Sequence, residues 1–241
     1  MSAVSGTDQQ QPKGTAAAAA EDDDRNPLHR AASAGQINLV RQLLETTNAY
    51  PIDLPDSLGW TPLIIAASAG HREVVAYLVE RGANVQAVTA NSQSALHFAC
   101  GKGHLEVVKL LVEGAGAPLN TRDRFGYTPF IRAVLANREA VVEYLLTSEK
   151  HRIDLDGKDK LGNSALHIAC EEENLRMVQL LLEAGADVKA TNGEGRTPLE
   201  GVTSQKLQRS LKDVFLEFGR PREAGAPAPV FKLTQPPSQD I

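Results

Sequence analysis

The sequence has little of what membrane proteins and nucleic-acid-binding proteins need. It contains 2 cysteines and 1 tryptophan in 241 residues, and its formal net charge is -5. A mildly acidic chain disfavours nucleic-acid binding, which needs a basic face. No stretch approaches the roughly 18 apolar residues of a membrane span. The Ala16–Ala20 run is too short and too weakly apolar for a signal peptide. We therefore expect a soluble protein of the cytoplasm and nucleus, with no nucleic-acid and no membrane partner.

Motifs that carry chemistry are also missing. The sequence has no phosphate-binding loop, dinucleotide-binding fingerprint, Ser/His/Asp grouping or zinc-ligand spacing. Acidic runs at Glu21–Asp24 and Glu171–Glu173 could bind a cation. Solvated or protein-binding surface is the more frequent role of such runs. The sequence therefore predicts a protein that is not an enzyme and has no catalytic residue, cofactor or metal site.

What the sequence has in abundance is self-similarity. Six segments read NPLHRAASAG, TPLIIAASAG, SALHFACGKG, TPFIRAVLAN, SALHIACEEE and TPLEGVTSQK, and their successive starts lie 35, 33, 34, 36 and 33 residues apart. This period and pattern resemble the ankyrin repeat over roughly residues 22–219. The resemblance implies an all-α ankyrin-repeat solenoid of about six helix-turn-helix repeats with hairpin-like fingers.

Each repeat has physical signals for two helices. A Thr, Ser or Asn opens the segment and can cap a helix start, and Pro or Ala follows at the first helical position. Gly35, Gly70 and Gly103 are expected to end the first helix in a left-handed conformation. Glu173 stands at that glycine position in the fifth repeat. Because one unit cannot cover its own apolar faces, stability must come from stacking against neighbours.

The composition changes at both ends of the repeat array. Residues 1–21 and the proline-rich residues 220–241 have too few large apolar side chains to offset their ordering entropy, so we predict disordered tails. Within the tail, Val230–Thr234 is either a docking peptide or, more simply, idle chain. The predicted repeats span 22–55, 56–88, 89–122, 123–158, 159–191 and 192–219.

The histidines and cysteines repeat at equivalent positions. His29, His97 and His167 share one position, and Cys100 and Cys170 share another. Helices pack at about 8–10 Å, so residues two repeats apart should be separated by about 20 Å. That distance excludes a shared metal and a disulfide. We therefore expect histidines with structural roles and buried cysteines.

Exposed finger residues are the candidate anchors for a partner. The finger positions that stand out are Leu58, Trp60, Phe125, Tyr127 and Leu161. Aromatic side chains at the middle of a binding surface are typical anchors. The alternative is that Trp60 and Tyr127 pack against the neighbouring finger. The ends of the inner helices vary in charge, and the fifth, with Glu171 and Glu172, is acidic.

The departures from the general repeat resemble the gankyrin-like family of ankyrin-repeat chaperones that assemble the proteasome regulatory particle. The segments GWTPLIIAASAG (59–70), GNSALHIACEEE (162–173) and GEGRTPL (193–199) carry this resemblance, with the Ala87-Val88 step and Lys102. It implies a chaperone that binds the C-terminal domain of one proteasomal ATPase subunit along a concave face. The family's charged pairs fall here on Asp23, Arg25, Lys102 and Glu172, near Trp60. We expect a monomer.

The chain also departs from that family. It shows six clear repeats where the family has seven, Ser57 replaces an acidic finger residue, and the fourth repeat diverges most. A generic ankyrin adaptor in signalling or transcription therefore stays open as the alternative. The segment Ile168–Glu172 lies where a relative carries a retinoblastoma-binding motif. Ile168 and Cys170 are expected in the helix core, which argues against such a motif here.

Overall fold

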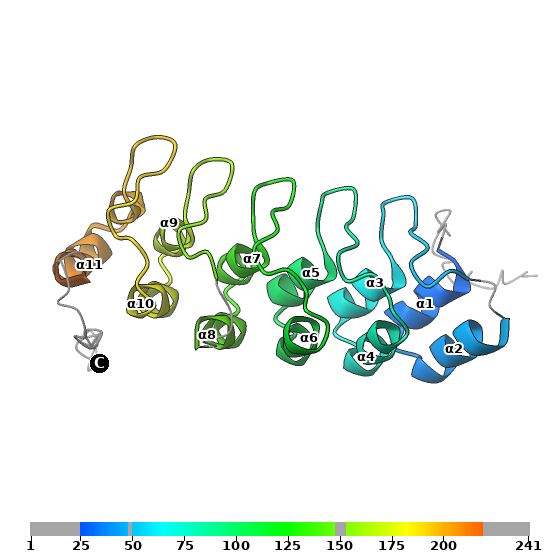
Figure 1. The fold of residues 1–241 in the computed structure, drawn as a ribbon. Coiled ribbons are helices and arrows are strands. Elements are labelled where there is room, and N and C mark those ends of the chain that lie inside the picture. Colours follow the sequence, from blue (N-terminus) through cyan, green and yellow to red (C-terminus); the bar gives the residue numbers. More distant parts are fainter. Residues whose placement is uncertain (1–24, 48–49, 148–152, 219–241) are drawn as a thin grey trace, which may run out of the picture.

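The computed structural model describes residues 25–47, 50–147 and 153–218. In these ranges eleven α-helices follow one another as a row of stacked pairs, and the same ranges contain no β-strand (Figure 1). This confirms the predicted all-α ankyrin solenoid. The two predicted tails and Asp23 lie outside the described residues.

Two rows of helices run along the array (Figure 1). The row beside the fingers consists of α1 (Pro27–Ser33), α3 (Pro62–Ala69), α5 (Ala95–Lys102), α7 (Pro129–Leu135), α9 (Ala165–Glu171) and the 3-10 turn η3 (Pro198–Gly201). The outer row consists of α2 (Ile37–Gln42) with the π-turn η1 (Leu43–Thr47), α4 (Arg72–Glu80), α6 (Leu105–Lys109) with η2 (Leu110–Gly114), α8 (Glu139–Thr147), α10 (Leu175–Glu183) and α11 (Gln205–Phe218). Contacts run between neighbouring pairs, as stacking requires.

The inner helices begin at the predicted caps. The Thr61 side chain accepts a hydrogen bond from the Ile64 amide, and Pro62 takes the first helical position. Where histidine follows three residues after the cap, the cap becomes reciprocal. At α5 the Ser94 amide donates to His97 Nδ1 over 3.1 Å. The histidine thus satisfies a backbone donor that the helix leaves unpaired.

The inner helices end in left-handed residues. Gly70 and Gly103 have φ values of 80° and 83°, as expected from glycine at this position. Asn137 and Glu173 adopt the same conformation with φ of 55° and 53°. The fifth repeat therefore keeps the turn although glycine is absent there.

A single apolar core runs the length of the described array. The inner helices contribute fully buried side chains such as Leu63 and Leu166, and outer helices contribute residues such as Leu78 and Leu181. Cys100 and Cys170 are also buried, with exposed fractions of 0% and 1%. They act as small apolar residues in this core. None of the described helices has the length and apolar character needed to cross a membrane.

The fingers form a second stacked layer (Figure 1). In each finger a backbone pair closes a tight turn, for example Asp123 N to Tyr127 O over 2.9 Å. One backbone hydrogen bond then joins each finger to the next. These four bonds run from Ala90 N to Leu58 O, Arg124 N to Asn91 O, Lys160 N to Phe125 O and Gly193 N to Leu161 O.

Candidate protein-binding face

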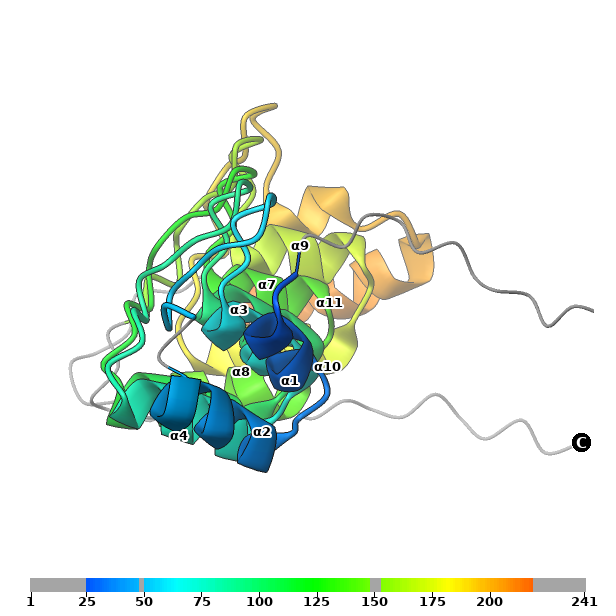
Figure 2. The ribbon, with the colours of Figure 1, turned by 90° about the vertical axis from the view of Figure 1, so that its right-hand side faces the viewer.

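The finger loops and the ends of the inner helices meet at an angle. Viewed along the array, the fingers project from the helix layers and overlap one another as a layer of loops (Figure 2). We call the surface made by the finger turns and the inner helices the binding face. It brings together the finger residues and the helix ends singled out in the sequence.

Finger turns are held rigid by a polar side chain at their first residue. Asp56 Oδ1 accepts from the amides of Leu58 and Trp60 over 3.0 and 2.8 Å. Asp159 and Asn192 do the same in the fifth and sixth repeats, with bonds of 2.8 to 3.0 Å. The finger tips are therefore preorganised, which lowers the entropy cost of binding.

Trp60 packs within the solenoid. Its ring centroid lies 4.3 Å from that of Phe98, which belongs to α5 in the next repeat. Both rings are half-buried. Trp60 therefore packs against the inner helix of the next repeat, whereas the alternative considered for it was packing against the neighbouring finger. The exposed apolar residue of this finger is Leu58, at 58%.

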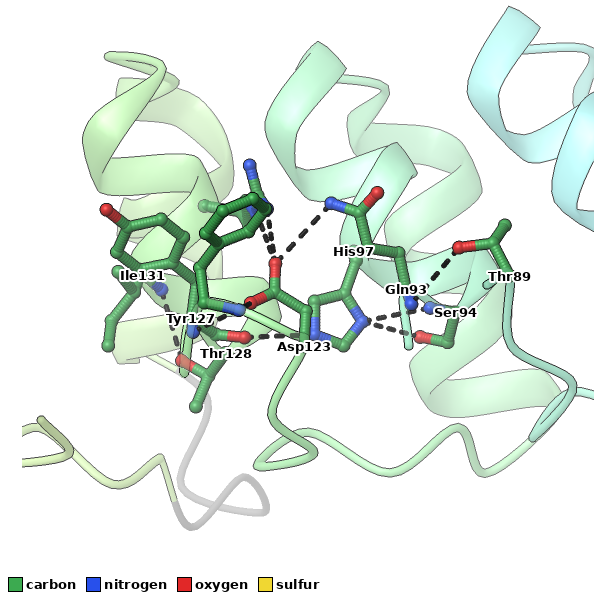
Figure 3. Close-up of polar contacts among 10 residues, drawn as sticks. Thr89, Gln93, Ser94, His97, Asp123, Tyr127, Thr128 and Ile131 are labelled. Atoms are coloured by element: carbon green, nitrogen blue, oxygen red, sulfur yellow. Dashed lines mark hydrogen bonds and ion pairs between the residues drawn. The ribbon is translucent and has the colours of Figure 1, made fainter. Parts of the chain in front are cut away.

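The fourth finger builds a cluster of aromatic and charged side chains (Figure 3). Asp123 is buried, and its carboxylate accepts from Arg132 Nε over 2.8 Å and from the Phe125 and Tyr127 amides over 2.8 and 3.0 Å. The Arg132 guanidinium lies 4.9 Å from the Tyr127 ring centroid and 5.7 Å from that of Phe125. Gln93 extends the cluster to the third finger through a 3.4 Å bond to Asp123. The cluster fixes two aromatic rings on the face.

Histidines tie successive repeats together behind the face. Because the Ser94 amide donates to His97 Nδ1, the proton of the neutral ring lies on Nε2, which donates to the Tyr127 carbonyl over 3.1 Å (Figure 3). His167 makes the same bond to the Arg196 carbonyl over 3.0 Å. Burial lowers the pKa of both imidazoles, more than their hydrogen bonds to backbone carbonyls raise it. These histidines have structural roles.

Charged residues of the face are spread along the inner row. Lys102, at the end of α5, is exposed, and so are Glu171 and Glu172 at the end of α9. Arg25 is half-buried, and its Nε donates to Asp56 Oδ2 over 3.2 Å. Its side chain therefore supports the second finger from the first repeat, while its role toward a partner stays a prediction.

Exposure separates the remaining predicted anchors. Phe125 and Leu161 are 53% and 70% exposed, whereas Tyr127 is half-buried beneath Arg132. Ile168 and Cys170 are buried, at 5% and 1%, as expected from their place in the helix. That burial removes the apolar side of a pocket-binding motif from the surface.

Sequence reasoning missed Phe98 and Arg132. Both occupy the fifth position of the ten-residue segment that opens the inner helix, a position held by Ile65 in the second repeat and Ile168 in the fifth. The available signal was that the residue type at this fifth position varies among the six segments, while its neighbours in the segment stay similar. No group of three or more His, Cys, Asp or Glu side chains that could hold a metal occurs among the described residues.

Comparison with known proteins agrees with this architecture. The family model for ankyrin repeats (3 copies) matches residues 6–89 and 83–159, and that for ankyrin repeats (many copies) matches 149–202. An ankyrin repeat-containing protein of Schizosaccharomyces pombe is 37% identical over 187 residues, covering 76% of this chain and 77% of the relative. Alpha-latrotoxin-Lg1a of Latrodectus geometricus is 32% identical over 195 residues, covering 81% and 14%.

A third relative, the nuclear factor NF-kappa-B p105 subunit of Gallus gallus, is 31% identical over 203 residues, which are 80% of this chain and 20% of that protein. The chain thus spans about three quarters of the fission-yeast protein but a small part of the other two. Stacked helix pairs, preorganised fingers and matching family models lead to one conclusion. The chain belongs to the ankyrin-repeat family, whose members are typically non-catalytic and bind other proteins.

Proposed function

We propose that this protein is a non-catalytic assembly chaperone of the 26S proteasome regulatory particle. It would act as a monomer in the cytoplasm and nucleus and hold the C-terminal domain of one proteasomal ATPase subunit against its binding face. The bound chaperone would sterically prevent the ATPase ring from docking early on the core particle. The mechanism needs affinity and bulk, with no chemical step.

One observation carries the proposal. Lys102 and Glu172 are exposed at the ends of inner helices two repeats apart, and neither has an ion-pair partner among the described residues. The family resemblance places charges of opposite sign at these positions for contact with the ATPase domain. Two separated charges of opposite sign select a partner with the complementary pattern.

Charge reversal tests the proposal directly. The expected result is that Lys102→Glu and Glu172→Arg each weaken binding of the cognate ATPase domain at least ~50-fold, because like charges then meet inside a desolvated interface. Arg72→Glu and Glu73→Arg make matched changes at exposed positions on α4 in the outer row, and they should leave affinity unchanged. Calorimetry against the C-terminal domains of all six proteasomal ATPases provides the measurement.

The outcomes separate the candidate functions. If no ATPase domain binds the wild-type chain, the chaperone proposal fails and the generic adaptor in signalling or transcription replaces it. If one domain binds but tolerates both reversals, the partner is right and the contact at α5 and α9 is wrong.

A further inference from the structure

The tips of the fourth and fifth fingers carry a repeated pair of exposed side chains. Each tip presents a basic residue followed by a large apolar one: Arg124 with Phe125, and Lys160 with Leu161. All four are exposed, and Phe125 and Leu161 reach 53% and 70%. We call these four residues the tip ridge.

Neither basic side chain of the tip ridge has a hydrogen-bond or ion-pair partner among the described residues. No hydrogen bond or ion pair joins the side chain of Arg124 or Lys160 to another described residue, whereas the neighbouring Arg122 pairs with Asp154 at 3.8 Å. The carboxylates nearest in sequence, Asp123 and Asp159, are buried and accept backbone amides. The tip ridge therefore presents positive charge without local neutralisation.

The backbone of the tip ridge is fixed. Lys160 N donates to Phe125 O over 3.1 Å, and Gly193 N donates to Leu161 O over 2.8 Å. A Cβ on Gly126 would lie 2.9 Å from Lys160 N, so the two turns are in close contact. Binding there would not have to order the loops first.

The same position in the other fingers sets the limits of the ridge. Leu58 is apolar and 58% exposed but follows the neutral Ser57, while the third finger has Ala90 and Asn91 and the last has Gly193 and Glu194. Basic-apolar pairs thus occur only at the fourth and fifth tips among the described fingers. The chain as a whole has a net charge of -5, which opposes a polyanion such as RNA.

From exposure, charge and rigidity we infer that the tip ridge is a binding site for an extended acidic segment of a partner protein. Adjacent repeats stack at about 10 Å, and an extended chain advances about 3.3 Å per residue. The segment would therefore carry two apolar residues three positions apart, each next to an Asp or Glu. Leu58 would take a third apolar residue about six positions away. The inference rests on protein binding at this face and not on the identity of the ATPase partner.

A charge-swap experiment tests the inference. A labelled 14-residue peptide with apolar residues at this spacing and adjacent Asp or Glu is titrated with the full chain, and fluorescence anisotropy is measured. We expect Arg124→Glu/Lys160→Glu to weaken binding at least 10-fold. A second peptide with Lys in place of Asp and Glu should bind the wild-type protein at least 10-fold more weakly than the acidic peptide does. The double variant should bind this Lys peptide with the affinity that the wild type has for the acidic peptide. Arg72→Glu/Lys212→Glu, which reverses two exposed charges on α4 and α11, serves as the control and should change nothing.

Other results would overturn the inference. These are no binding of the acidic peptide to the wild type at up to ~1 mM, or equal affinity for the wild type and the double variant. Binding of single-stranded RNA or phosphatidylserine vesicles that depends on Arg124 and Lys160 would assign the ridge to another class of ligand. Lys102→Glu should leave peptide binding unchanged. Peptide binding therefore tests the tip ridge, and binding of the ATPase domain tests the proposed function.

Discussion

Cys170 shows how little room one repeat leaves for the next. It is 1% exposed in the seam between helix pairs, and the equivalent residues in the first, second and fourth repeats are Ala32, Ala67 and Val134. We expect Cys170→Ala to be mild and Cys170→Leu to cost about 1–3 kcal/mol, because an overpacked core must distort. Urea unfolding followed by circular dichroism measures both. A leucine tolerated without loss would mean that the side chain points out of the seam.

The buried thiol makes a chemical prediction at the same residue. Burial, with a smaller effect of the nearby Glu171 carboxylate, raises the pKa of the Cys170 thiol to about 12. Because the thiolate is the reactive form, we expect no modification of the folded protein by a thiol reagent at pH 8. Prompt modification under native conditions, without urea, would contradict the burial.

The histidine bridges predict how stability depends on pH. Burial holds the folded-state pKa of His97 and His167 below the ordinary 6.5. The neutral rings therefore stabilise the fold fully above about pH 6.5, and this contribution is lost as pH falls through the lower folded pKa. Between pH 7.5 and 5, His97→Gln/His167→Gln should lose less unfolding free energy than the wild type. Denaturant titrations of both proteins at the two pH values provide the measurement. If the wild type and the double variant lose the same unfolding free energy, these histidines do not contribute to acid destabilisation.

At the scale of the element, glycine is needed for two separate reasons, one in the turn after α4 at Gly82 and one in the fifth finger at Gly162. Gly162 and Gly82 both have positive φ, at 81° and 84°. A Cβ on Gly162 would lie 2.4 Å from the Gly193 amide nitrogen of the next finger, whereas a Cβ on Gly82 would meet nothing within 4 Å. We expect Gly82→Ala to cost about 1 kcal/mol from backbone strain alone. Gly162→Ala should cost at least ~2 kcal/mol more, because the finger turns must separate. Equal melting temperatures for the two variants would show that the fingers do not support one another.

The sequence predicts elements better than it predicts contacts between them. Caps, helices and turns follow from local residue types, so they recur as predicted in the first five repeats. In the sixth repeat the predicted inner α-helix is instead the 3-10 turn η3. The partner of Trp60 could not be predicted in this way, since Phe98 lies in the next repeat at a variable position. The Asp123–Arg132 pair was missed for a related reason. Its two residues belong to different elements of one repeat, and other repeats lack the pair.

At the scale of the whole molecule, the last repeat depends on a strained residue. Glu173 has φ of 53°, and its Oε1 accepts from Thr203 Oγ1 and the Ser204 amide, both over 2.8 Å, just before α11. Glycine would relieve the strain, which costs about 1–2 kcal/mol. It would also remove two charge-assisted hydrogen bonds, worth about 1.5–3 kcal/mol each. The bonds thus outweigh the strain.

We therefore expect Glu173→Gly to loosen the end of the solenoid. Amide exchange should accelerate in α11 and stay unchanged in α3 and α5, because repeats interact only with their neighbours. Ser92→Gly is the matched variant, since Ser92 has φ of 59° and its side chain makes no hydrogen bond to another described residue, and this change should be neutral or stabilising. Unchanged exchange in α11 would show that the two bonds do not anchor it.

The sparse backbone hydrogen bonding between neighbouring fingers has a mechanical consequence. Helix layers are joined by broad apolar contact, whereas neighbouring fingers are joined by one backbone hydrogen bond per step and by a few side-chain hydrogen bonds, such as Gln93 to Asp123. An array that is stiff along its helix layers and compliant along its fingers can bend. Small rotations at each junction between repeats then add up along its length. The terminal repeats then move farthest while every junction is strained only slightly. A partner that touches both ends would set the curvature of the whole array, and the elastic energy spread over the finger links would assist its release.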